Sequence, residues 1–305
     1  MNGASFPPAV DIREVGPRDG LQPERPVAVE DRIRFVHALQ DAGVRHIEAA
    51  AFVSPKAVPA MAGAAEVMAG IDQRDDVTYA ALVPNVKGAE LALAAGVDEL
   101  TVTISASEGY NRSNVGMSVA ESELVVGRIC AQAGGVPVDA VVSCAFGSPY
   151  EGDLALSSVV GLGERLLEAG CSRVTWADTT GMATPTRVGA LLDAVEAGGV
   201  AADTGLHLHD TRGTALVNAY VALSRGVARF DTAVGGLGGS PFAPGATGNL
   251  ATEELVALLD DLGVATGIEV EPLIDVAALV AELVGRPVPG RLAAAGPRTR
   301  PAGEA

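Results

Sequence analysis

Two histidines separated by one residue form the most informative chemical pattern in this sequence. His207 and His209 lie in the run GLHLHD, which begins at Gly205 and is predicted to form a strand. Side chains along a strand alternate faces with a period of two, so both imidazoles are expected to point the same way. Two histidines and one carboxylate are a common ligand set for a divalent metal with open positions. The pattern is also compatible with two hydrogen-bonded core histidines, so both interpretations stay open.

A second group of charged residues accompanies the first two predicted strands. Asp19 is a candidate third metal ligand, and Arg18 beside it carries the planar fork of donors that binds a carboxylate or an oxyanion. The alternative is an ordinary surface ion pair between these two side chains. Glu14 and Glu48 are interpreted as carboxylates that orient Arg18 and the histidines, and the alternative is a pair of buried acids at the site.

The elements that must position these residues follow from an alternation of β-branched runs with longer Ala- and Leu-rich runs. The predicted strands are VDIREV from Val10, RHIEAAAF from Arg45, VTYAALV from Val77, ELTVTIS from Glu99, VDAVVSCAF from Val138, RVTWAD from Arg173, GLHLHD from Gly205 and RFDTAV from Arg229. Eight strand–helix units favour an α/β fold of the TIM (β/α)8 barrel type. We expect one barrel domain over residues 1–290, with extra C-terminal helices after Gly263 and a disordered polar tail over residues 291–305.

The polar motifs of the chain fall where the predicted strands end. They include GPRDGLQPE, SASE, SCAFGSPYEG, ADTTG and HLHD, and the eighth strand is followed by GGLGGSPFAPGATGN. In a barrel of this type the carboxyl ends of the strands carry the functional residues. The last motif, residues 235–249, is interpreted as a lid over the site, with a plain connector as the alternative. It lacks the lysine of a P-loop, which disfavours nucleotide binding.

Composition excludes several classes of function. The 305 residues carry a formal net charge of −17, which argues against binding to nucleic acid or to an anionic membrane surface. Cys130, Cys144 and Cys171 form no Cys-x-x-Cys pair, which disfavours a disulfide framework or a zinc site and fits a reducing compartment. The N-terminal residues lack the features of a targeting peptide, and no apolar run is long enough to span a membrane. We therefore expect a cytoplasmic protein with a small-molecule partner.

The chain resembles the hydroxymethylglutaryl-CoA lyases, a family of barrel metallolyases related to isopropylmalate synthase. The resemblance extends from about Val10 to Gly263 and rests on the motifs VGPRDGLQ, FVSPK, VSCAFGSPYEG, DTTG, HLHDTRG and GGLGGSPFAPGATGNLATE. It implies cleavage of the C2–C3 bond of 3-hydroxy-3-methylglutaryl-CoA, or of a close 3-hydroxy-3-alkyl acyl-CoA, to acetyl-CoA and a keto acid such as acetoacetate. It also implies a homodimer, and a place in leucine degradation and ketone-body metabolism.

The resemblance implies a role for each residue that matches the family's motifs. Mg²⁺ or Mn²⁺ would be bound by Asp19, His207, His209 and Asn249. Arg18 would stabilise the enolate of the departing acetyl-CoA, and His207 or Asp19 would take the proton of the C3 hydroxyl. Glu48 would hold Arg18 or the substrate. Positions near the acyl group or around the metal are Gln22, Ser107, Tyr150 and Asp178. Arg25 and Lys56 are candidate CoA contacts by position only.

One residue departs from the family pattern. Where the lyases carry a cysteine in the Gly-rich loop as an acid–base group, this chain has Ser240, whose hydroxyl is a far weaker acid but can still donate a hydrogen bond. Ser240 stays among the catalytic candidates. Three interpretations are open: a slower lyase that uses water or another group, a lyase for a related substrate with a different proton donor, or a homologue that only binds acyl-CoA. A further alternative is a Claisen-type acyl-CoA/2-keto acid synthase or an aldolase, although the length disfavours a synthase with a regulatory domain.

Overall fold

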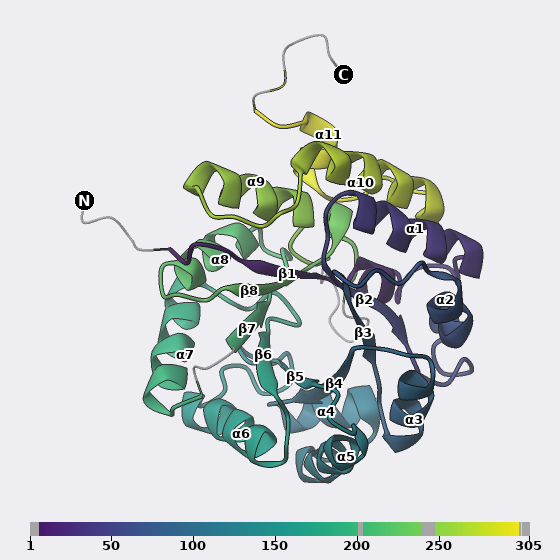
Figure 1. Ribbon diagram of the computed structural model, residues 1–305. Coiled ribbons are helices and arrows are strands. Elements are labelled where there is room, and N and C mark those ends of the chain that lie inside the picture. Colours follow the sequence, from purple (N-terminus) through teal and green to yellow (C-terminus); the bar gives the residue numbers. More distant parts are fainter. Residues whose placement is uncertain (1–5, 201–203, 240–247, 299, 301–305) are drawn as a thin grey trace.

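Eight parallel strands form a closed barrel in the computed structural model, which describes residues 6–200, 204–239, 248–298 and 300 (Figure 1). Each strand pairs with the next along the chain, and β8 pairs with β1 to close the barrel. The strands are β1 (Asp11–Glu14), β2 (His46–Ala51), β3 (Thr78–Leu82), β4 (Glu99–Ser105), β5 (Val138–Ser143), β6 (Arg173–Ala177), β7 (Thr204–His207) and β8 (Arg229–Thr232). The predicted TIM barrel is therefore confirmed.

Helices cover the outside of the barrel in a ring (Figure 1). They are α1 (Val29–Asp41), α2 (Ala64–Gly70), α3 (Val86–Ala94), α4 (Glu108–Val115), α5 (Val119–Gln132), α6 (Leu156–Glu168), α7 (Pro185–Ala197), α8 (Ala215–Leu223), α9 (Thr252–Leu262), α10 (Val270–Val284) and α11 (Arg291–Ala295). The short helical turns are η1 (Gly16–Gly20), η2 (Pro59–Met61) and η3 (Val234–Gly236). Within the described ranges, no helix is long and apolar enough to cross a membrane.

The helices expected after Gly263 are present as α10 and α11. α10 packs against α1 and against η3, so it supports the segment that follows β8. Where a disordered tail was expected from residue 291, the chain first forms α11, and the backbone N–H of Arg291 donates a hydrogen bond to Glu254 at 2.6 Å. The end of that predicted tail, residues 301–305, lies outside the described residues. The domain boundary at residue 290 stays a prediction.

Two strands, β5 and β7, end three residues earlier than their sequence patterns predict. VDAVVSCAF leaves the sheet after Ser143, because Cys144 has a φ of 58°, a left-handed conformation that breaks the strand. GLHLHD leaves the sheet after His207. The prediction that His207 and His209 share one strand is therefore wrong, since His209 lies beyond β7 in an isolated bridge with Asn249.

The amino-terminal half of the barrel interior is ionic rather than apolar. Inward-facing positions of β1, β4, β5 and β8 carry Arg13, Glu99, Asp139 and Asp231, each at most 5 % exposed. Burial of charge is costly unless each group is paired, and here every carboxylate lies within 3.0 Å of the Arg13 guanidinium. This layer lies directly below the carboxyl ends of the strands, where the polar motifs gather.

Candidate metal and substrate site

Asp19, His207 and His209 meet at the carboxyl ends of the barrel strands. Each offers a ligand atom, and these atoms all lie within 4.8 Å of one another. The two Nε2 atoms of His207 and His209 are 3.1 Å apart, so both rings present the same nitrogen to one point. Asp19 comes from η1, directly after β1, and its side chain remains 22 % exposed. A carboxylate and two imidazoles that converge in this way can hold a divalent metal ion.

The orientation of His207 depends on a buried carboxylate behind it. Nδ1 of His207 lies 3.1 Å from Oδ2 of Asp231, which leaves Nε2 facing Asp19 and His209. Burial alone would lower the pKa of His207, but the hydrogen bond to Asp231 and the charge of Asp19 raise it above its ordinary value. Asp231 in turn accepts two hydrogen bonds from Arg13, both of 2.9 Å.

Arg18 lies beside the metal candidates and is held by two carboxylates. Its Nε and Nη2 both lie 2.6 Å from Oε2 of Glu48, and its Nη1 donates to Asp19 at 2.7 Å. Burial would raise the pKa of Asp19, yet the charges of Arg18, His207 and His209 lower it to about 2. Asp19 is therefore an ionised carboxylate at neutral pH, as a metal ligand must be. The expectation that Glu48 orients Arg18 agrees with this geometry.

Asn249 reaches the same site from the segment after β8, where it forms an isolated β-bridge with His209. Its amide nitrogen donates to Oδ2 of Asp19 at 2.8 Å and to the carbonyl of Leu237 at 2.9 Å. Its Oδ1 is buried and finds no hydrogen-bond partner in the described part of the chain. A buried amide oxygen without a donor is the kind of atom that a hard cation can satisfy. The residues present therefore fit a divalent metal ion.

Glu14 has a different role from the expected one. Within the described residues it contacts neither Arg18 nor a histidine, and accepts hydrogen bonds from the backbone N–H groups of Gly16 and Val234 and from the Thr252 hydroxyl. It thus ties the loop after β1 to the segment after β8. Burial raises the pKa of Glu14 to about 7. Glu253, which accepts from the Gly235 N–H at 3.0 Å, also has its pKa raised to about 7 by burial.

A cavity of about 560 Å³ opens beside the metal candidates. Arg18, Asp19, His207 and His209 lie at its polar end, and Gln22 lines it as well. The rest of the wall is largely apolar and comes mainly from β3, β4, the end of α4 and α5. Its apolar residues include Leu82, Val102, Val115, Met117, Val125, Val126 and Ile129. A few convergent polar groups in an otherwise apolar cleft are typical of a small-molecule site.

Three candidates from the sequence, Ser107, Tyr150 and Asp178, are not among the residues that line this cavity. Ser107 caps α4 and shares hydrogen bonds with Ser148 and Glu151. Tyr150 is 51 % exposed and packs edge-on against Tyr110.

Asp178 is buried between two residues that do line the cavity, Ala177 and Thr179. Burial raises its pKa to about 6. Its Oδ1 accepts the backbone N–H groups of Met182 and Ala183. Its Oδ2 is buried and has no partner within the described ranges. Ser240 lies outside the described residues, while Arg25 and Lys56 are exposed.

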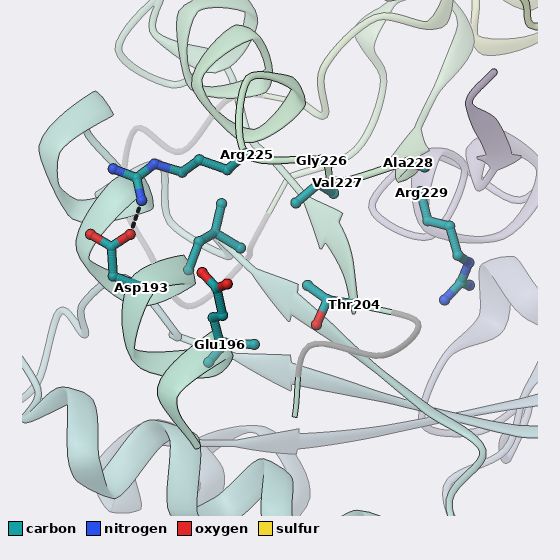
Figure 2. A pocket seen from close by; sticks show the side chains of 10 residues that line it. Asp193, Glu196, Thr204, Arg225, Gly226, Val227, Ala228 and Arg229 are labelled. Atoms are coloured by element: carbon teal, nitrogen blue, oxygen red, sulfur yellow. Dashed lines mark hydrogen bonds and ion pairs between the residues drawn. The ribbon is translucent and has the colours of Figure 1, made fainter. Parts of the chain in front are cut away.

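A second cavity of about 460 Å³ lies at the opposite end of the barrel, where β7 and β8 begin (Figure 2). Figure 2 shows Arg225 and Asp193 at its edge, joined as an ion pair. Barrel enzymes keep their reacting groups at the carboxyl ends of the strands, so this cavity carries no candidate role.

Comparison with known proteins agrees with this geometry. The sequence model of the HMGL-like family matches residues 9–280. The chain belongs to the HMGL-like family. It is 44 % identical to the hydroxymethylglutaryl-CoA lyase of Bacillus subtilis, over 94 % of this chain and 97 % of that protein. It is 43 % identical to the 3-hydroxy-3-isohexenylglutaryl-CoA/hydroxymethylglutaryl-CoA lyase of Pseudomonas aeruginosa, over 92 % of this chain and 95 % of that one.

Solved structures of the family share the whole barrel. The hydroxymethylglutaryl-CoA lyase of Pseudomonas aeruginosa superposes with a TM-score of 0.92 at 43 % identity, covering 95 % of this chain and 98 % of that one. The lyase of Acinetobacter baumannii, solved with coenzyme A and 3-methylmalate, gives a TM-score of 0.93 at 39 % identity, covering 97 % of this chain and 98 % of that one. The arrangement of strands and helices around the site is thus that of the family.

Sequence reasoning missed the two residues behind His207. Asp231 lies in the predicted strand RFDTAV and Arg13 in VDIREV, so both strands were found but not these charges. A charged residue in the middle of a buried strand is itself a signal, because such a group must be paired. What the sequence could not indicate is the partner, since 218 positions separate Arg13 from Asp231.

Proposed function

We propose that this protein is a metal-dependent carbon–carbon lyase that cleaves 3-hydroxy-3-methylglutaryl-CoA to acetyl-CoA and acetoacetate. The observation that carries the proposal is the convergence of Asp19, His207 and His209 beside Arg18, in a chain 40–44 % identical to several hydroxymethylglutaryl-CoA lyases. The family's enzymes are carbon–carbon lyases by name, and the cavity beside these residues has room for a short acyl group.

We propose Mg²⁺ or Mn²⁺ as the metal, held by Asp19, His207, His209 and the amide oxygen of Asn249. The buried, unpartnered Oδ1 of Asn249 and the ionised state of Asp19 support this ligand set. A mixed set of oxygen and imidazole ligands suits these hard or borderline cations better than a thiolate-binding metal. When bound, such a cation supplies Lewis acidity that lowers the pKa of a hydroxyl in contact with it.

The remaining chemistry falls to the side chains around the cavity. Asp19 or His207 accepts the proton of the C3 hydroxyl, and the oxygen becomes the carbonyl of the keto acid as the C2–C3 bond breaks. The electron pair of that bond moves to C2 and the thioester oxygen. Arg18 stabilises the developing enolate with a guanidinium that Glu48 already holds in place. Protonation of C2 then completes acetyl-CoA.

Gln22, Asp178, Ser107, Tyr150 and Ser240 keep their proposed roles around the acyl group. The unpartnered Oδ2 of Asp178 supports a contact with substrate or with an ordered water. Ser240 stands where the family's acid–base cysteine is expected, so we propose Ser240→Cys as a gain-of-function variant. A higher rate of acetyl-CoA release would support a family-like loop, and an unchanged or lower rate would mean that another group protonates C2.

A substrate screen tests the proposal. Purified protein with Mg²⁺ or Mn²⁺ is expected to release acetyl-CoA from 3-hydroxy-3-methylglutaryl-CoA, and chelation or His209→Ala is expected to abolish the release. No release above the His209→Ala background, across 3-hydroxy-3-alkylglutaryl-CoA and citramalyl-CoA substrates, would refute it. Consumption of acetyl-CoA with a 2-keto acid would instead identify a synthase, and binding of metal and CoA without turnover would identify a binding protein.

We also propose a cytoplasmic homodimer that acts in leucine degradation and ketone-body metabolism. Composition supports the location, and the family resemblance supports the assembly and the metabolic role. Size-exclusion chromatography with light scattering tests the assembly.

A further inference from the structure

Arg13 occupies the centre of the ionic layer inside the barrel. It is 2 % exposed and lies one residue before the end of β1. Its Nε and Nη2 donate to the two oxygens of Asp231 at 2.9 Å each, in a bidentate pair. Its Nη1 lies 3.0 Å from Glu99 and 2.8 Å from Asp139. Every nitrogen of the guanidinium therefore has a carboxylate partner.

We propose that Arg13 is a positioning residue for the metal site and acts through Asp231 on His207. The chain of contacts is short and fully buried: Arg13 fixes both oxygens of Asp231, and Asp231 holds Nδ1 of His207 at 3.1 Å. This leaves Nε2 of His207 directed at the point shared with His209 and Asp19. The inference rests on the proposed function, because it takes His207 as a metal ligand.

The geometry favours a positioning role over simple charge balance. A carboxylate with one fixed oxygen can rotate about its Cβ–Cγ bond, whereas the bidentate pair with Arg13 fixes the plane of Asp231. Arg13 on β1 is itself held by Glu99 on β4 and Asp139 on β5, so these three strands together constrain the direction of His207. A lysine would keep the charge at this position but could not bind both oxygens in one plane.

A matched control lies in the same layer. Arg173 begins β6 and donates to Oε2 of Glu99 at 2.7 Å, on the other carboxylate oxygen from the one that Arg13 contacts. Among the described residues, Arg173 forms its ion pair with Glu99 and none with Asp231. Arg173→Met therefore removes a cation from this network without removing the bidentate support of Asp231.

The test measures Mn²⁺ binding to the metal-free protein by calorimetry, with no substrate present. Arg13→Met is expected to weaken Mn²⁺ binding by about 10- to 100-fold, the usual effect of losing a group that orients a metal ligand. Arg13→Lys is expected to lose less, and Arg173→Met is expected to bind as the unaltered protein does. Equal affinity in Arg13→Met and the unaltered protein would overturn the inference.

A double-mutant cycle separates positioning from general loss of structure. If Arg13 acts through Asp231, then Arg13→Met/Asp231→Asn should bind Mn²⁺ as weakly as Asp231→Asn alone, because the second change has nothing left to act on. The double variant also removes one of the three buried carboxylates that Arg13→Met alone leaves without this cation, which lowers the cost to folding. A further loss in the double variant, as large as that of Arg13→Met alone, would overturn the inference.

His209→Ala distinguishes failure of this inference from failure of the proposed function. If His209→Ala keeps full Mn²⁺ affinity, the metal does not bind at the histidines and both proposals fall. If His209→Ala loses binding while Arg13→Met keeps it, only the role of Arg13 falls.

Discussion

Replacement of Glu14 by glutamine tests whether burial raises the pKa of this carboxyl group in the folded protein. Glu14 is fully buried, and burial raises its pKa from 4.5 to about 7, against the opposing effect of its hydrogen bonds from Thr252, Val234 and Gly16. The nearby charge of Glu253 raises the pKa further. In its protonated form, Glu14 can donate to the Thr252 hydroxyl, which itself lies 2.8 Å from Thr232. A glutamine amide can take the place of this protonated group.

The sign of the effect on stability follows from the linkage between proton binding and folding. Below pH 4.5 both the folded and the unfolded protein carry a protonated Glu14, so the shift costs nothing. Between pH 4.5 and about 7 only the unfolded state loses its proton, and the folded state becomes progressively less stable. A tenfold change in acidity corresponds to about 1.4 kcal/mol, so the full loss above the folded pKa is about 3 kcal/mol. Glu14→Gln removes this loss.

The assay is urea unfolding followed by circular dichroism at pH 4.5 and pH 8, with chelator present. We expect the free energy of unfolding of Glu14→Gln, relative to the unaltered protein, to rise by about 3 kcal/mol between the two pH values. Glu66→Gln, on the exposed side of α2, is the control and should show no such change. The same difference at both pH values would refute the reasoning, because folding would then leave the pKa of Glu14 unchanged.

Two further predictions concern the site itself, and a third concerns the buried cysteine at the end of β5. Gly238→Ala should weaken Mn²⁺ binding about tenfold in calorimetry. The φ of Gly238 is +93°, and an added Cβ would lie 2.5 Å from the amide nitrogen of Asn249. Unchanged affinity for Mn²⁺ would contradict this prediction. Arg18→Met should lower kcat by about 100- to 1,000-fold in the acetyl-CoA assay, because the enolate loses the cation that stabilises it. The loss should exceed that of Arg18→Lys, because methionine also leaves the buried Glu48 carboxylate without its ion pair. Cys144 is fully buried and burial raises its pKa to about 12, so a thiol reagent should label it only in urea, as peptide mass spectrometry would show.

Much of the fold can be predicted because barrel units are local. Each strand and the helix after it are encoded by a contiguous run, as ELTVTIS illustrates: it forms β4 over its full length. The ends of the strands are less predictable, because a strand ends where its hydrogen bonds to the neighbouring strand end. Nothing in VDAVVSCAF indicates that Cys144 adopts a left-handed backbone, since that conformation depends on contacts with the neighbouring loop, such as the Thr179 hydroxyl.

The residues of the site were likewise predictable only where local sequence patterns encode them. Residue types and their place after successive strands were enough to select Asp19, His207 and His209 as candidates, because parallel strands in a barrel end on one face. Asn249 became a candidate only through the family resemblance. The sequence could also assign the chain to its family, through motifs that are local.

Only the tertiary structure decided which side chains support these residues. Glu14 anchors two loops rather than orienting Arg18. Arg13 lies behind His207 because closure of the barrel pairs β1 with β8 and brings Arg13 beside Asp231. The first and last strands of the chain become neighbours only when the sheet closes. Their contacts depend on register and closure, which no local pattern encodes.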